Sequence, residues 1–89
     1  MKVTFRNSFY DDIQKARCTP WLSKIKELVQ IVRHNPFQTP PPYEKLKGYV
    51  NTYSRRINQQ HRLIYKVYTD GITDGVAFLH CWGHYETLR

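Results

Sequence analysis

The chain has 89 residues, which is enough for one compact domain spanning residues 1–89 and no more. Its 40% hydrophobic and 15% aromatic residues exclude an intrinsically disordered chain. Fourteen Lys and Arg against seven Asp and Glu give a net charge of +7, which favours a polyanionic partner such as RNA, DNA or an acidic protein. The alternative is a basic surface that serves only solubility.

Cysteine usage and hydropathy indicate a compartment. Cys18 and Cys81 lack C-x-x-C spacing and are too few for a disulfide scaffold. The N-terminal MKVTFRNSFYDD has no apolar signal-peptide core, and no apolar run approaches the roughly 20 residues of a membrane helix. We therefore expect a cytoplasmic protein with reduced thiols and no membrane association.

The first half of the chain predicts a strand and two helices. Residues 2–6 alternate polar and apolar side chains, as a strand does. Asn7 or Ser8 then caps a helix that stops around Cys18. Thr19 as N-cap and Pro20 at the first helical position begin a second helix. The apolar stripes of the two helices are Phe9, Ile13 and Ala16, and Trp21, Leu22, Ile25, Leu28, Val29 and Val32.

The second half predicts strands. The second helix ends near His34, because Asn35 precedes Pro36, and residues 35–43 form a stiff, proline-rich connection. Residues 53–58 and 61–68 resemble two strands of a hairpin joined at Gln59-Gln60. A loop follows at 70–75, and residues 76–84 form the last strand. This order predicts an α+β sheet with helices on one face.

Metal and thiol chemistry have little support in the sequence. On a strand, His80 and His84 would lie about 13 Å apart, too far to share a zinc ion, and Cys81 would face the other side. A cysteine in an apolar strand is usually a buried small hydrophobe rather than a nucleophile. We therefore expect neither a metal site nor a cofactor.

The segment from residue 43 to residue 62 combines Lys, Arg and Tyr with a single carboxylate, Glu44. The cations neutralise phosphates and the tyrosines stack on unpaired bases, although a solvated cationic sheet face is an equal alternative. RNA can be cut without a metal if a base deprotonates the 2′-hydroxyl, an acid protonates the leaving oxygen and a cation stabilises the phosphorane. Glu44, His84 and Arg62 are candidates for base, acid and cation, but spacing alone does not bring them together.

The stretch 43–48 (YEKLKG), followed by 53–58 (YSRRIN) and 61–65 (HRLIY), resembles the signature of the YoeB/Txe toxins, which belong to the RelE superfamily. His84-Tyr85 matches the His-Tyr pair near the end of that family's chains. The resemblance covers nearly the whole chain, and its central block is the specific part. It implies an α+β, RelE-like microbial ribonuclease fold with two N-terminal helices packed on an antiparallel β-sheet.

The resemblance also implies roles. The activity would be ribosome-dependent cleavage of mRNA in the A site, which inhibits translation. Glu44 would be the general base, Arg62 the transition-state stabiliser and His84 the general acid, with Tyr85 positioning the substrate. Two cations, Lys47 and Arg56, match the family's supporting residues for the scissile phosphate. A two-residue loop at Gln59-Gln60 would instead place Arg55 on the face of Arg62, so the choice of Arg56 follows the motif.

The resemblance implies partners as well: a cognate acidic antitoxin similar to YefM or Axe, the bacterial ribosome with its mRNA, a possible homodimer, and operator DNA reached only through the antitoxin complex. Two features depart from the family pattern. Glu86–Arg89 extend past the His-Tyr pair, where a carboxylate would raise the pKa of His84 or the tail would obstruct the site. Pro40–Pro42 precede Glu44 and would stiffen its loop.

Two other functions remain compatible with the sequence. A protein with this charge could bind the ribosome or RNA without cutting, if the tail disables His84. A toxin of related fold acts on DNA gyrase, but that activity has no need of the Glu, Arg and His-Tyr set present here.

Overall fold

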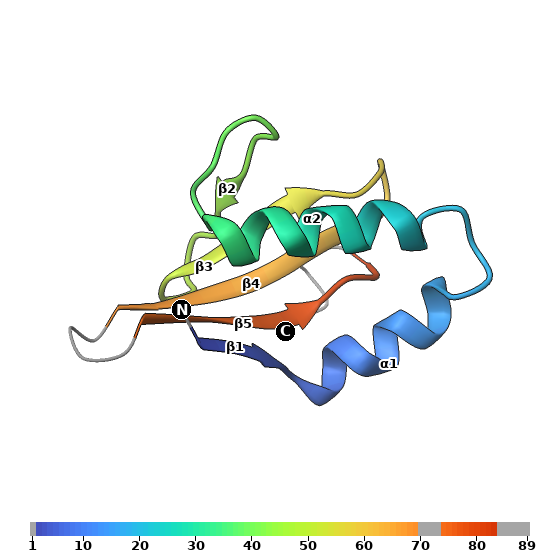
Figure 1. Cartoon of the computed structure of the whole chain (residues 1–89), viewed down its shortest axis with the longest axis horizontal. Helices are drawn as coiled ribbons and strands as arrows, with labels where there is room; N and C mark the ends of the chain where they lie inside the picture. Colours follow the sequence, from blue (N-terminus) through green and yellow to red (C-terminus); the bar gives the residue numbers. More distant parts are fainter. Residues whose placement is uncertain (1, 70–73, 84–89) are drawn as a thin grey trace.

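The computed structural model describes residues 2–69 and 74–83 of the chain (Figure 1). Its elements follow the predicted order of strand, helix, helix and strands, which confirms the α+β class. They are β1 (Lys2–Phe5), α1 (Asn7–Ala16), α2 (Leu22–His34), β2 (Glu44–Lys45), β3 (Thr52–Arg56), β4 (Arg62–Thr69) and β5 (Asp74–His80). No helix within the described residues is long and apolar enough to cross a membrane.

The strands form one five-stranded sheet in the order β1-β5-β4-β3-β2. β2, β3, β4 and β5 pair antiparallel, but β1 runs parallel to β5, with Lys2 opposite Gly75 and Phe5 opposite Phe78. The prediction of an antiparallel sheet is therefore wrong at one edge. Alternation within residues 2–6 identifies a strand but says nothing about its partner, which lies more than 70 residues along the chain.

Thr19 forms the junction between the two helices. Its backbone N–H and its hydroxyl both donate to the carbonyl oxygen of Ala16, at 3.0 and 2.8 Å, and so satisfy the end of α1. The hydroxyl oxygen also accepts the N–H of Trp21 at 3.2 Å. Regular helix begins at Leu22 rather than at Pro20. The start of α1 also differs from prediction, because Arg6 occupies the N-cap position and Ser8 Oγ donates to Leu79 O at 2.6 Å.

Helix α2 covers one face of the sheet, and its apolar stripe has the predicted 3.6-residue spacing (Figure 1). The four buried side chains of this stripe are Ile25, Leu28, Val29 and Val32. They join Phe9 and Ala16 of α1 and the alternate residues Leu63, Tyr65 and Val67 of β4 in one core. Each fully buried aliphatic side chain contributes about 1.5–3 kcal/mol relative to an exposed one, so this core supplies most of the stability.

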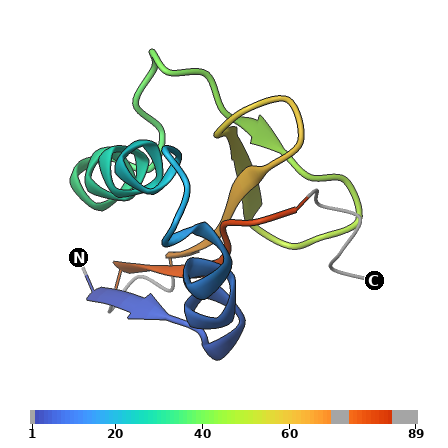
Figure 2. The same ribbon diagram turned by 90° about the vertical axis from the view of Figure 1, so that its right-hand side faces the viewer.

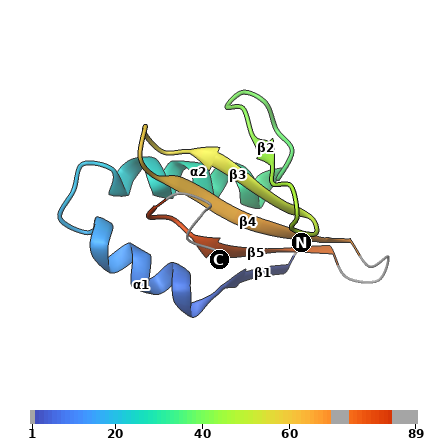
Figure 3. The ribbon, with the colours of Figure 1, turned by 180° about the vertical axis from the view of Figure 1, so that it is seen from behind.

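Neither helix of the described residues covers the opposite face of the sheet, as the view from behind shows (Figure 3). Because side chains alternate along a strand, the residues between the core positions point to this face. They include Ser54 and Arg56 on β3, and Arg62, Lys66 and Tyr68 on β4. The open face therefore combines cations, hydroxyls and an aromatic ring.

Two strand ends differ from prediction. The hairpin loop runs from Ile57 to His61 rather than over Gln59-Gln60 alone, since β3 ends at Arg56 and β4 begins at Arg62. The last strand covers Asp74–His80 rather than residues 76–84. It therefore includes residues 74 and 75, which were expected in a loop. The end-on view shows how the chain leaves the sheet after β5 near the hairpin loop (Figure 2).

Candidate active site

A buried arginine, Arg55, anchors the proline-rich connection that leads to Glu44. Its side chain is 1% exposed and lies within 6 Å of the rings of Tyr43 and Tyr65. Its guanidinium donates to the carbonyl oxygens of Pro41 at 2.5 Å and Pro36 at 3.0 Å, and Tyr65 Oη donates to Pro36 O at 2.8 Å. The connection is therefore fastened to β3 and β4 from the core side.

This anchoring places Glu44 on the open face. Glu44 lies on the short edge strand β2, opposite Ser54 of β3, and Ser54 is buried. Glu44 itself is exposed, and no salt bridge joins it to another side chain within the described residues. An accessible carboxylate with no cation partner in the part of the chain that the structure describes can accept a proton there, as a general base must.

Arg56 and Arg62 face each other across the β3–β4 pair. The longer loop explains this register, because Asn58 Oδ1 accepts the N–H groups of Gln60 and His61, each at 2.8 Å, and so stabilises a turn from Ile57 to His61. Arg56 and not Arg55 therefore shares a sheet face with Arg62. The parity expected for a two-residue loop is wrong, and the motif-based choice of Arg56 agrees with the observed register.

Glu44, Arg56 and Arg62 line one hollow of about 350 Å³, together with Pro42, Tyr43 and Ser54. Like charges directly opposite on neighbouring strands repel each other, which makes this position costly unless an anion sits between them. Neither arginine forms a salt bridge with another described residue. We call this cavity the Glu44 hollow; its chemistry is that of an anion site beside a carboxylate.

Lys47 lies outside the Glu44 hollow. It is exposed in the turn after β2 and lines a separate small cavity of about 300 Å³ with Glu44, Lys45 and Leu46. A flexible lysine there adds positive charge near the rim, but the structure does not bring it against Arg56 or Arg62.

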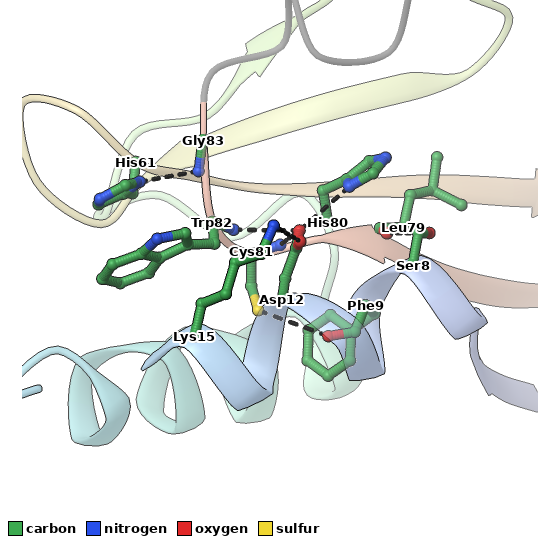
Figure 4. A network of polar contacts seen from close by, with 10 residues as sticks. All are labelled: Ser8, Phe9, Asp12, Lys15, His61, Leu79, His80, Cys81, Trp82 and Gly83. Carbon is green, nitrogen blue, oxygen red and sulfur yellow. Dashed lines mark hydrogen bonds and ion pairs between the residues drawn. The ribbon is translucent and has the colours of Figure 1, made fainter. Parts of the chain in front are cut away.

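The segment after β5 is held at Gly83 by two residues of the hairpin, His61 (Figure 4) and Arg62. The N–H of Arg62 donates to Gly83 O at 2.9 Å, and the N–H of Gly83 donates to His61 Nδ1 at 2.8 Å. Gly83 has a φ of +108°, a conformation that favours glycine. The two remaining candidates, His84 and Tyr85, follow Gly83 in the sequence and lie outside the described residues, as does the tail.

Asp12 anchors this segment from α1 (Figure 4). Its carboxylate is 5% exposed, and Oδ2 accepts the N–H groups of Cys81 at 3.1 Å and Trp82 at 3.3 Å. The same oxygen lies 3.1 Å from His80 Nδ1. Sequence reasoning gave neither Asp12 nor His61 a role. The signal for Asp12 was its place on the buried stripe of α1, three residues after Phe9.

The environment of two titratable groups near this segment is unusual. Burial, and secondarily the positive charge of Arg62, lower the pKa of His61, which keeps its imidazole neutral and Nδ1 free to accept. Burial raises the pKa of Cys81 to about 12, with a further contribution from Asp12. Cys81 is thus a protonated, packed thiol and is unsuited to nucleophilic chemistry.

A larger hollow of about 500 Å³ lies toward β1, with Lys2, Arg6 and Tyr68 in its lining. Arg6 Nη2 donates to Tyr68 Oη at 3.0 Å. None of the described residues that line this hollow is a carboxylate, so these residues can attract an anion but supply no carboxylate base. The Glu44 hollow differs from it by joining a carboxylate to two arginines that face each other across neighbouring strands.

No cluster of three His, Cys, Asp or Glu side chains suited to a metal ion occurs in residues 2–69 and 74–83. His80 contacts the Asp12 carboxylate, and Cys81 lies beyond the end of β5. The distance expected between His80 and His84 assumed that both lie on one strand. It does not apply, because the strand ends at His80.

Comparison with known proteins places this geometry in a family. The model of the YoeB-like toxins of bacterial type II toxin–antitoxin systems matches residues 5–85. Toxin YoeB of Escherichia coli (strain K12) is 38% identical over 65 residues, covering 72% of this chain and 73% of that protein.

Solved structures agree. A YoeB/ParE toxin from Agrobacterium tumefaciens superposes with a TM-score of 0.81 at 31% identity, over 96% of this chain and 100% of the other. The dimer of YoeB from Staphylococcus aureus superposes with a TM-score of 0.76 at 29% sequence identity. YoeB in the heterotetrameric YoeB-YefM complex from Staphylococcus aureus superposes with a TM-score of 0.73 at 30% sequence identity. Each of these two matches covers 96% of this chain and 98% of the other. The chain belongs to the family of YoeB-like toxins of bacterial type II toxin–antitoxin systems.

Proposed function

We propose that this toxin is a ribosome-dependent endoribonuclease that cleaves mRNA in the ribosomal A site and thereby inhibits translation. The observation that carries the proposal is the Glu44 hollow, where two opposed arginines and a carboxylate with no salt-bridge partner among the described residues line the same space. A scissile phosphate with its adjacent 2′-hydroxyl needs these groups, an anion site beside a base.

In the proposed reaction Glu44 removes the proton of the 2′-hydroxyl, whose oxygen attacks the neighbouring phosphorus. Arg62 stabilises the added negative charge on the phosphorane oxygens, and Arg56 binds the same phosphate from the opposite strand. His84 gives its proton to the leaving 5′-oxygen, so a 2′,3′-cyclic phosphate and a 5′-hydroxyl end form. Tyr85 stacks on or positions the substrate, and Lys47 contributes charge at the rim. No metal ion is required.

Loop contacts support the role of Arg62. Its Nη1 donates to Asn58 O at 2.5 Å and to His61 O at 3.1 Å. These bonds restrict the guanidinium before any substrate arrives, and a cation whose position is already set stabilises a transition state better than one that must be ordered.

The proposed partners follow from charge and family. A net charge of +7 suits the ribosome, its mRNA and an acidic antitoxin. The complex of Staphylococcus aureus YoeB with YefM supports a YefM-like antitoxin, and the dimer of that YoeB supports a homodimer. We place the protein in the bacterial cytoplasm, in contact with operator DNA only through the antitoxin complex.

The test is primer extension on an mRNA translated in a reconstituted bacterial system. Wild type should produce new 5′ ends within A-site codons. Glu44→Gln and His84→Gln should slow cleavage by about 10²–10⁴-fold, the usual contribution of a general base or acid. Glu27→Gln on the exposed surface of α2 removes a carboxylate of the same kind and should cleave like wild type.

Three results would contradict the proposal. Intact message despite ribosome binding would indicate a binding or regulatory protein. Inhibition of DNA supercoiling in place of cleavage would indicate action on gyrase. Equal loss in Glu27→Gln and Glu44→Gln would remove the special role of the Glu44 hollow.

A further inference from the structure

We propose that His61 is a positioning residue of this toxin: its neutral imidazole holds Gly83 against Arg62 and so fixes the point at which the chain enters the His84-Tyr85 pair. The inference rests on the proposed function, since it concerns the same site. It concerns geometry within the described residues, at the last residue before the candidate acid.

Gly83 is held at both of its backbone polar groups by two consecutive residues, His61 and Arg62. Its N–H donates to His61 Nδ1 at 2.8 Å, and its carbonyl oxygen accepts the N–H of Arg62 at 2.9 Å. Since Arg62 also contributes its guanidinium to the Glu44 hollow, one short segment ties the cation of the site to Gly83.

The imidazole of His61 is itself fixed by its neighbours. Its ring stacks on the indole of Trp82, with centroids 3.7 Å apart and planes inclined by 16° (Figure 4). The N–H of Trp82 in turn donates to Asp12 Oδ2, and the N–H of His61 donates to Asn58 Oδ1. The histidine is therefore immobilised from the hairpin loop and from α1, more firmly than an exposed loop residue would be.

The hydrogen bond from Gly83 also fixes which ring nitrogen of His61 carries the proton. A backbone N–H is always a donor, so Nδ1 must be unprotonated to accept it, and the proton of the neutral ring resides on Nε2. Protonation at Nδ1 would replace this hydrogen bond by two donors facing each other. Among the described residues, the charged groups that act on the ring are Arg62, which disfavours protonation, and Asp12, which favours it and is itself contacted by His80 and Lys15. Burial and Arg62 prevail, and the pKa of His61 is lowered.

Two isosteric substitutions separate this role from a merely structural one. In His61→Asn the side-chain oxygen takes the place of Nδ1 and can accept the Gly83 N–H, but it does not titrate. In His61→Gln the polar group takes the place of Nε2, so the acceptor at Nδ1 is lost. Both variants lose the ring, so stacking on Trp82 is removed equally from each.

The experiment is single-turnover cleavage on programmed ribosomes from about pH 5.5 to 8, the range in which histidines titrate. At neutral pH, His61→Gln should lower the cleavage rate at saturating ribosomes by about 10–100-fold, because a displacement of a reacting group by about 1 Å costs about that much in rate. The ribosome concentration that gives half of the maximal rate should stay within about twofold of the wild-type value. His61→Asn should stay within about threefold of wild type and should lack the decline in rate that wild type shows toward acid as His61 protonates.

A second measurement does not depend on cleavage. Hydrogen exchange of the Gly83 amide, followed by NMR, should be slow in wild type and His61→Asn and fast in His61→Gln. If wild type does not cleave, the proposed function fails while the exchange data still judge the hydrogen bond. Equal exchange in all three proteins, equal rates in both variants, or loss of protection in both would overturn the assignment to Nδ1.

Discussion

Replacing Asp12 by alanine should destabilise the protein far more than a surface substitution. Removal of the carboxylate leaves the N–H groups of Cys81 and Trp82 without their acceptor. Cys81 is fully buried, so its orphaned donor costs about 2–3 kcal/mol, whereas water can partly replace the bond to the half-buried Trp82, at about 1 kcal/mol. We expect a loss of about 3–4 kcal/mol.

That loss is a large fraction of the total. A domain of 89 residues is stable by about 5–13 kcal/mol, and about 1 kcal/mol corresponds to 4–8 °C in Tm at this size. Asp12→Ala should therefore lower Tm by about 12–30 °C. Asp12→Asn, which keeps one acceptor oxygen, should lose about half as much free energy.

The assay is urea unfolding followed by far-UV circular dichroism, since Trp82 lies too near the mutation for its fluorescence to be a neutral probe. Asp11→Ala is the matched control, because this neighbour on the same helix is exposed and should change stability by less than about 0.5 kcal/mol. A loss below about 1 kcal/mol for Asp12→Ala, or equal losses for both variants, would refute the reasoning.

Three further outcomes are expected. Arg55→Ala should lower the free energy of unfolding by about 2–4 kcal/mol, because it removes a buried guanidinium with three hydrogen bonds. Arg56→Ala should change this free energy by less than about 0.5 kcal/mol but slow cleavage at least about tenfold. Urea unfolding measures the stability of both variants, and primer extension measures their cleavage. Exposed Cys18 should react with iodoacetamide at about pH 8, as mass spectrometry would report. Buried Cys81 should react only after unfolding, because its pKa of about 12 leaves a thiolate fraction of about one in ten thousand at that pH. The pKa of His61 in the folded protein lies below its ordinary value of 6.5, so at a pH between the folded and unfolded pKa the unfolded chain binds more protons. The contribution of neutral His61 to stability is therefore full above pH 6.5 and is lost as the pH falls through the lowered pKa. This part of the dependence of Tm on pH should vanish in His61→Asn.

Local periodicity accounts for what the sequence predicted well. The stripe of α2 and its end at His34 depend on spacing and on Pro36, both of which are visible within a few residues. Tertiary partners are not visible in this way. Neither the parallel pairing of β1 with β5 nor the two-residue strand β2 has a local pattern, since each exists only because another strand lies beside it.

In the candidate site, too, the residue types could be predicted from the sequence but their tertiary partners could not. Glu44 and Arg62 were chosen from their chemistry and the family resemblance, but their convergence depends on the β2–β3–β4 register. In the longer hairpin loop Asn58 Oδ1 accepts two N–H groups, and the register that goes with this loop pairs Arg56 with Arg62 and leaves Arg55 buried. A residue count between strands could not reveal it. The roles of His84 and Tyr85 stay predictions.

The position of β1 at the edge, paired only with β5, has a consequence for biosynthesis. Lys2 and Gly75 are 73 residues apart, so their pairing closes nearly the whole chain into a loop, at an entropic cost of about 4 kcal/mol. A nascent chain grows from its N-terminus, and its first strand must wait for the fifth before it has a neighbour. Gly83 also joins Arg62 only after β5 is made. The sheet and the attachment of Gly83 to Arg62 are thus incomplete until synthesis has passed β5, and protease protection of stalled nascent chains should appear only when β5 has emerged.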